Sequence, residues 1–268
     1  MPSLNLLGRL ARRNRAFVLA CAGIFLLFEF LVAAAVSTLN VEAMGAQIFA
    51  TLPPMLQVMF GDQFATMFTS SGMLAFGWNH PIVLALGGAV AVMLGTRAIA
   101  AEVESGAIEL VLAQPISRAA YFGTHVLFAL LALALVACGG LAGSLLGESV
   151  YGLPLFHPAP ALALTFNFWL LQSSFFGLAL LLSSGAREAG RAGGAAFLLL
   201  LASFLMQAIG GLIKKYAFLL PWSLYERYLP RALLTTGRVP SASLAVLGGV
   251  LLLSLALAWW RFRRRDLP

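Results

Sequence analysis

The chain has 268 residues, of which 61% are hydrophobic and 10% are charged, and its mean hydropathy is +0.93. Soluble domains have about a quarter of their residues charged, so this composition excludes a soluble globular protein and indicates an integral membrane protein. The formal net charge of +7 does not indicate a nucleic-acid partner, because the basic residues cluster at the ends of apolar stretches, as membrane anchoring predicts. The chain also has no zinc-finger spacing and no basic stripe with interleaved aromatic residues, which excludes nucleic acid as a partner.

The first fifteen residues differ from the apolar stretch that follows them. In "SLNLLGRLARRNR", residues 3–15, the apolar side chains share one helical face and four arginines crowd the other side and the end. This pattern is typical of a helix that lies on an anionic membrane surface. We therefore expect residues 1–15 to form an amphipathic interfacial helix.

The remaining chain, residues 16–268, is predicted to form a single all-α membrane domain with six transmembrane helices. A spanning helix needs about 20 mostly apolar residues. Six stretches meet this requirement: about 16–37, 79–100, 120–146, 161–183, 193–213 and 242–260. Glycine clusters in the third span and near the fifth predict close helix packing. These glycines are Gly139, Gly140, Gly143, Gly190, Gly193 and Gly194.

The distribution of basic residues predicts that both termini face the cytoplasm. With that orientation, 12 of the 17 Lys and Arg residues are cytoplasmic. The last outer loop opposes this bias locally, but no unused apolar stretch supplies the extra span that the reverse topology needs. The twelve are Arg9, Arg12, Arg13, Arg15, Arg97, Arg118, Arg187, Arg191, Arg261, Arg263, Arg264 and Arg265; the five outer ones are Lys214, Lys215, Arg227, Arg231 and Arg238.

Two outer segments are predicted to contact the membrane interface. Residues 38–78 contain no Lys or Arg, and apolar side chains recur in them at helical spacing, which predicts short helices on the outer leaflet. These apolar residues are Met55, Met59, Phe60 and Phe64. Residues 214–241 have the aromatic composition of an interfacial belt. Their aromatic residues include Tyr216, Trp222, Tyr225 and Tyr228.

The segment "AAEVESGAIELVLAQPISR", residues 100–118, holds three of the ten acidic residues of the chain. Its pattern predicts the end of one helix, a break at Ser105–Gly106, a short apolar helix and a stop before Pro115. Arg118 then meets the inner leaflet as the third span begins. The segment is therefore expected to be a small amphipathic element suited to docking a partner. The alternative is a solvated loop whose charges only anchor the chain.

This segment resembles the signature of ABC-2-type permeases, the membrane subunits of ATP-driven exporters. In that family an acidic pair precedes Gly-Thr, a further acid, a Leu-rich run, a proline and an arginine in the first cytoplasmic loop. This chain departs from the pattern at Ala107, where the family usually has Thr. An interfacial N-terminal helix, six spans and a re-entrant outer segment before the last span complete the resemblance. The residues that carry it are Glu102, Glu104, Gly106, Glu109, Leu110, Leu112, Pro115, Ser117 and Arg118.

The resemblance implies a permease subunit of an ABC exporter that has no catalytic residues of its own. Residues 100–118 would be its coupling element, docked in a groove of a separate ATP-binding subunit. The chain lacks GxxxxGK[ST], so ATP and Mg²⁺ are expected on that partner, and no cofactor or metal is expected here. The resemblance further implies a second permease copy or a related permease, with membrane lipids around them, in a prokaryotic inner membrane.

The second cytoplasmic loop carries Arg187, Glu188 and Arg191, which are expected to make a secondary contact with the ATPase subunit. The cargo stays open at this point. A drug or peptide antibiotic, a lipid or glycan, and a factor for metalloenzyme maturation all fit the family.

Glu29 lies within the first span, in "FLLFEFLV". An intramembrane carboxyl group costs a few kcal/mol on insertion scales, which makes Glu29 a candidate pathway residue. The alternative is a protonated or hydrogen-bonded side chain that only supports packing. Two other functions are alternatives to the exporter. One is a proton-coupled secondary transporter with Glu29 as its proton site, and the other is a membrane scaffold without transport. The absence of paired sequence halves argues against the secondary transporter.

Overall fold

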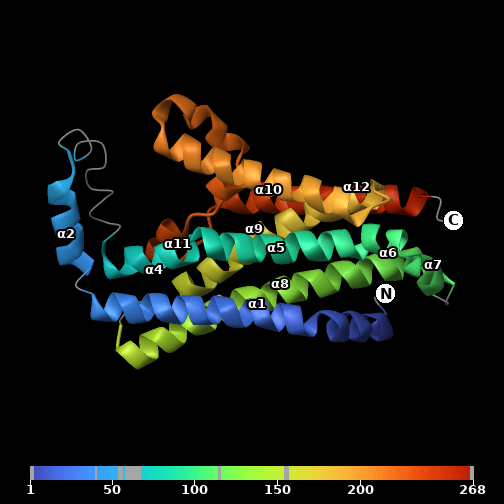
Figure 1. The fold of residues 1–268 in the computed structure, drawn as a ribbon, viewed down its shortest axis with the longest axis horizontal. Helices are drawn as coiled ribbons and strands as arrows, with labels where there is room; N and C mark the ends of the chain where they lie inside the picture. The colour runs from blue at the N-terminus through green and yellow to red at the C-terminus, as the bar shows by residue number, and fades with distance from the viewer. Residues whose placement is uncertain are drawn as a thin grey trace.

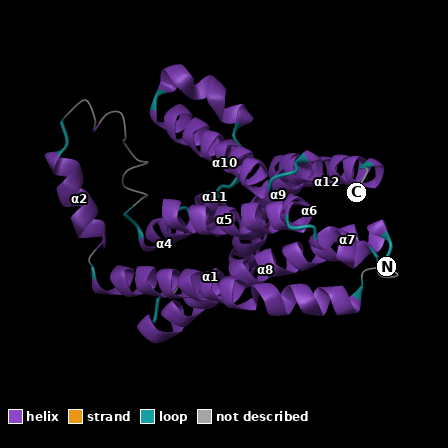
Figure 2. Ribbon diagram, turned by 45° about the vertical axis from the view of Figure 1, so that its right-hand side comes forward, coloured by secondary structure: helices purple, strands orange, loops and turns teal. Residues whose placement is uncertain are grey.

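A computed structural model describes residues 3–39, 41–53, 57, 68–113, 116–153 and 157–265. Over these residues the chain is almost entirely helical and contains no strand (Figure 2). The α-helices are α1 (Leu4–Thr38), α2 (Val41–Thr51), α4 (Ser70–Trp78), α5 (Pro81–Ala98), α6 (Ala100–Glu104), α7 (Ala107–Leu112), α8 (Arg118–Tyr151), α9 (Pro158–Gly185), α10 (Ala189–Leu212), α11 (Pro230–Thr236) and α12 (Ser241–Arg264). Two 3₁₀ helices, η1 (Lys214–Trp222) and η2 (Leu224–Arg227), lie between α10 and α11.

Six helical stretches are long and apolar enough to cross a membrane, which confirms the expected all-α membrane fold. They run through Leu4–Thr38, Gly72–Ala98, Arg118–Tyr151, Pro158–Gly185, Ala189–Leu212 and Ser241–Arg264. The long helices lie roughly side by side, and both ends of the described chain lie at the same end of the bundle (Figure 1).

The interfacial helix predicted for residues 1–15 is not a separate element, because α1 continues without a break from Leu4 to Thr38. Ser3 begins the helix by accepting a hydrogen bond from the Leu6 backbone N–H through its side chain. At 1.5 Å per residue, 35 residues span about 50 Å, whereas the hydrocarbon core is about 30 Å thick. Helix α1 is therefore longer than the hydrocarbon core is thick, which leaves room for its arginine-bearing first turns outside that core.

α9 forms the centre of the bundle and packs against α5, α8, α10, α11 and α12. In its most apolar stretch 78% of the residues are buried, compared with 22% for α10. Several polar side chains of α9 are buried with it, among them Asn167, Gln172 and Ser174. Ser174 donates hydrogen bonds through its hydroxyl to the carbonyls of Leu170 and, in α12, Leu247. A helix shielded from lipid in this way can carry polar groups that a lipid-facing helix cannot.

α1 and α8 pack closely because glycines of α8 face the α1 backbone. A Cβ atom built on Gly143 would lie 2.1 Å from the Leu26 carbonyl oxygen, and one on Gly139 would lie 2.4 Å from the Ala22 carbonyl oxygen. The predicted close packing of the third span is therefore confirmed. The same prediction is wrong for Gly190 and Gly194 of α10, where an added Cβ would meet no atom within 4 Å.

The segment between α10 and α12 turns back into the bundle at the end opposite to the termini. η1 packs beside α10, and α11 packs against α4 and α9 (Figure 1). Tyr225 and Tyr228 are buried, and the Tyr228 hydroxyl donates to the carbonyl of Trp78 at 3.1 Å. The predicted aromatic belt is wrong for these two tyrosines, whereas Tyr216 and Trp222 are exposed.

The other segment predicted to lie outside, residues 38–78, contains the expected short helices in α2 and α4. Met55, Met59, Phe60 and Phe64, whose spacing contributed to that prediction, lie outside the described residues.

Candidate functional site

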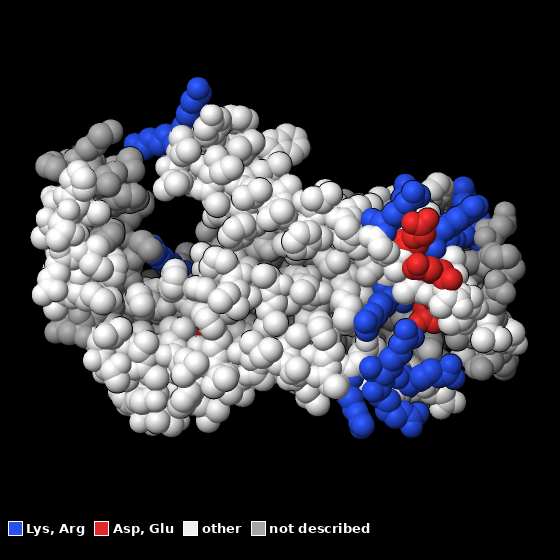
Figure 3. Space-filling model, in the orientation of Figure 1, with Lys and Arg blue, Asp and Glu red and all other residues white. Residues whose placement is uncertain are grey.

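Most of the charge gathers at the end of the bundle where both termini lie, which we call the arginine-rich end. In Figure 3 the basic side chains cluster there around acidic ones, and the middle of the visible face is uncharged. The elements that meet at this end are the start of α1, the end of α5, the coupling element, the α9–α10 connection and the end of α12. The name coupling element is used from here on only as a label for residues 100–118, the segment for which the family resemblance implies that role.

The coupling element has the break and the short helix that its sequence predicts. α6 ends at Glu104, and Gly106 has φ +71°, a left-handed conformation that glycine adopts without the strain imposed by a Cβ atom. α7 then places Ile108 in the core, at 1% exposure, and Leu110 outward, at 75% exposure. The side chains of Glu109 and Leu112, and all of Pro115, lie outside what the structure describes.

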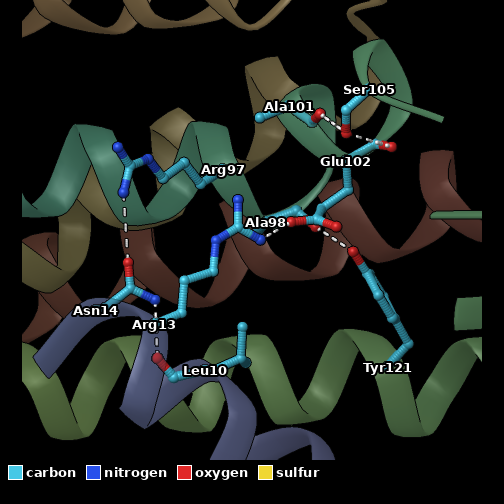
Figure 4. Close-up of polar contacts among 9 residues, drawn as sticks. All are labelled: Leu10, Arg13, Asn14, Arg97, Ala98, Ala101, Glu102, Ser105 and Tyr121. Atoms are coloured by element: carbon cyan, nitrogen blue, oxygen red, sulfur yellow. Dashed lines mark hydrogen bonds and ion pairs between the residues drawn. The ribbon is translucent and has the colours of Figure 1, made fainter. Parts of the chain in front are cut away.

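Glu102 faces the inside of the protein (Figure 4). Its carboxylate forms an ion pair with the Arg13 guanidinium of α1, and Glu102 is only 7% exposed. One residue further along α1, Asn14 donates from its amide to the Leu10 carbonyl and accepts from Arg97 at 3.5 Å. The side chain of Glu102 is therefore occupied by contacts within the chain.

These side chains border a cavity of about 20 Å³, which has room for a single water molecule. Close to this cavity, the Tyr121 hydroxyl of α8 donates to the Ala98 carbonyl at 2.7 Å and so fixes the end of α5 against α8 (Figure 4). Behind α6, Ser183 of α9 accepts a hydrogen bond from the Ala100 N–H and donates one to the Thr96 carbonyl. The junction of α5 and α6 is thereby held to α1, α8 and α9.

Glu104 is exposed and reaches across to α10. One of its carboxylate oxygens accepts a hydrogen bond of 2.8 Å from the backbone N–H of Ala189, which is the first residue of that helix. Glu188, at the N-cap position, makes no capping hydrogen bond with its side chain and instead pairs with Arg191 at 3.2 Å. Arg187, Glu188 and Arg191 are all exposed, as a secondary partner contact would require.

Arg118, at the start of α8, contacts the residues at which α12 ends. Its guanidinium donates to the carbonyls of Phe262, Arg263 and Arg265, with the bond to Arg265 the shortest at 2.7 Å. Arg265 in turn donates from its side chain to the Ser184 carbonyl, at the end of α9. Burial, together with the neighbouring positive charge of Arg187, lowers the pKa of Arg265.

Glu29, the candidate pathway residue, is completely buried in a polar cluster between α1, α4 and α8. Ser144 donates to one carboxyl oxygen at 3.3 Å and accepts from the Trp78 indole N–H at 3.1 Å. The other carboxyl oxygen has no hydrogen-bond partner among the described residues. Gly77 packs directly on the carboxyl group, since a Cβ there would lie 3.0 Å from both oxygens.

A larger cavity of about 650 Å³ opens at the opposite end of the bundle, between α4, α10 and α11. Its lining mixes apolar side chains such as Phe76 and Leu212 with the polar Asn79 and Gln207 and the charged Arg231. Glu29 does not line it. Over the described part of the chain, no group of three or more His, Cys, Asp or Glu side chains is placed to hold a metal ion.

A family model described as an ABC-2 family transporter protein matches residues 9–267. The chain belongs to the ABC-2 transporter family. Its resemblance to ABC-2-type permeases is thereby confirmed, and the six apolar helices are those of a multi-pass membrane protein. The protein is the permease of an ABC transporter, a membrane component that is not itself catalytic. No curated protein matches the chain.

The sequence indicates the charged residues of the segment 100–118 but not their partners within the chain. Arg13 and Ser183 lie far from residues 100–118 in sequence. Tyr121 lies close to the segment but is an ordinary residue of an apolar helix. Only the position of Arg13, on the polar side of an amphipathic first segment, gave any signal of a role at this end.

Proposed function

We propose that this permease belongs to an exporter, forms its transmembrane pathway, and is driven by ATP hydrolysis in a separate nucleotide-binding subunit. The observation that carries the proposal is the geometry of α7. This short helix follows a glycine break, is anchored by Ile108 and presents Leu110 outward, beyond the ends of the spans. An apolar side chain on a helix anchored in this way suits insertion into a groove of a partner protein.

The arginine-rich end is assigned to the cytoplasm on the positive-inside rule. The ATP-binding subunit would then approach α7 from the cytoplasm, with Arg187, Glu188 and Arg191 as its secondary contact. ATP and Mg²⁺ would bind that subunit, and this chain would need no cofactor. A second permease copy, or a related permease, would complete the pathway within a prokaryotic inner membrane, and the arginines would contact lipid headgroups.

The first experiment is a pull-down of the tagged chain from native membranes, with ATPase activity measured on the recovered material. We expect the unaltered chain to bring down an ATP-binding subunit in stoichiometric amount. Leu110→Asp should lose this subunit, because a carboxylate would have to be buried in an apolar groove. Leu4→Asp is the matched control: Leu4 is 81% exposed at the same end of the bundle but lies outside the coupling element.

Recovery of the chain alone, under conditions that preserve other membrane complexes, would contradict the proposal. Equal recovery of the ATPase with Leu110→Asp and Leu4→Asp would contradict the role of α7 as the docking helix.

A further inference from the structure

We propose that Glu102, Glu104 and Arg118 are positioning residues that connect the coupling element to three separate spans, and that the ATPase subunit docks on α7 without them. The inference rests on the proposed function, because it concerns how movement of the coupling element reaches the membrane. Each of the three residues contacts a different helix: Glu102 contacts α1, Glu104 contacts α10 and Arg118 contacts α12.

Glu102 is unavailable to a partner protein. It is 7% exposed, and its carboxylate is paired with Arg13. A buried carboxylate is stable only when it is paired and hydrogen-bonded, so a partner could reach it only by breaking the ion pair. The ion pair joins α1 to α6, and the Arg13 side chain is 54% exposed.

Glu104 provides the cap that α10 does not provide for itself. The first N–H groups of a helix have no partner within the helix, and a negative charge is favourable beside them. The side chain of the N-cap residue Glu188 accepts no hydrogen bond from these N–H groups. The Glu104 carboxylate accepts one instead, from the Ala189 N–H. The start of α10 is therefore bonded to the end of α6.

Arg118 provides the complementary contact at a helix C-terminus. The last carbonyls of a helix lack partners within it, and a positive charge beside them is favourable. Arg118 donates to the carbonyls of Phe262, Arg263 and Arg265, where α12 ends. The start of α8, and with it the end of the coupling element, is therefore bonded to the last span.

Together these contacts join the coupling element to every span. α5 and α8 continue from it covalently, α9 is held through Ser183, and α1, α10 and α12 are held through the three charged residues. A displacement of α6 and α7 therefore changes contacts to all six spans at once. Leu110 remains an outward side chain that a partner can contact.

The test is hydrogen exchange of the permease in its complex with the co-purified ATPase, without nucleotide and after trapping with ATP and vanadate. The Ala189 amide reports directly on Glu104, because it donates to that carboxylate. In the unaltered complex, we expect trapping to change exchange in the first turns of both α10 and α1. Glu104→Ala should speed exchange at the start of α10 by about tenfold, as expected for losing a charge-assisted hydrogen bond, and should abolish the nucleotide response there.

The same variant should keep its ATPase subunit and its response in α1. Glu104→Gln, which retains an accepting oxygen, should restore most of the protection at α10. In α1, Glu102→Gln should abolish the nucleotide response and leave α10 unchanged, whereas Arg12→Gln, which removes an exposed charge next to Arg13, should change neither.

Loss of the ATPase subunit from Glu102→Gln or Glu104→Ala would overturn the inference, because these residues would then contact the partner. Unchanged nucleotide responses in both variants would overturn it as well, since the contacts would then transmit nothing. If no ATPase accompanies even the unaltered chain, the proposed function fails and this inference fails with it; failure confined to the variants refutes the inference alone.

Discussion

Gly143→Ala should separate α1 from α8 and destabilise the permease. The added Cβ would lie 2.1 Å from the Leu26 carbonyl oxygen, whereas ordinary contacts begin at 3.4 Å, so one helix must move by about 1.3 Å. The obstacle is backbone, and no side-chain rotation can relieve it. Overpacking of this kind costs about 1–3 kcal/mol, against a gain of roughly 0.5–1 kcal/mol from replacing a helical glycine. We expect a net loss of about 1–2 kcal/mol.

Gly123→Ala is the matched control because it makes the same chemical change in the same helix. An added Cβ there would meet no atom within 4 Å, so only the gain in helix propensity applies, and stability should rise by roughly 0.5–1 kcal/mol. The assay is thermal unfolding of the two purified variants in one detergent, followed as the fraction that stays folded after heating. Equal midpoints, or a higher midpoint for Gly143→Ala, would refute the conclusion that glycines set the distance between α1 and α8.

Three further substitutions test buried polar groups of the bundle. Gln172→Leu should stabilise the protein by about 1–3 kcal/mol, because the Gln172 amide is fully buried without a partner among the described residues. A lower unfolding midpoint would contradict this expectation. Glu29→Gln should fold as well as the unaltered protein, since the amide oxygen still accepts from Ser144. With full transport it would remove Glu29 from the mechanism, whereas lost transport with an intact fold would place it there. Tyr228→Phe should lose about 1 kcal/mol of stability with its bond to the Trp78 carbonyl, and an unchanged midpoint would contradict that estimate.

The features that the sequence predicted correctly depend on local signals. Runs of apolar residues indicate the six spans, and the pair Ser105–Gly106 indicates the break before α7, because glycine readily adopts the left-handed conformation found there. The helix does not end at residue 15, and the reason is local as well. No residue near Arg15 ends a helix, so the charged turns and the first span form one continuous α1.

The partners of the charged residues could not be predicted, because they depend on how distant segments meet. Arg13 and Glu102 are 89 positions apart, and nothing in either segment indicates the other. The buried tyrosines between α10 and α12 illustrate the same limit. The composition of residues 214–241 is that of an interfacial belt, but the segment turns back into the bundle. Its fold brings the rings of Tyr225 and Tyr228 into the core.

The buried position of α9 has a consequence for how the chain is assembled during synthesis. Its polar side chains, including Asn167 and Gln172, would be unfavourable in contact with lipid, and neighbouring helices shield them in the finished bundle. α1, α5 and α8 are made before α9, but α10 and α12 follow it, and α12 packs extensively along α9. The centre of the bundle is therefore enclosed only after the last helix has been inserted. A chain that stopped before α12 would leave its most polar span open to the bilayer.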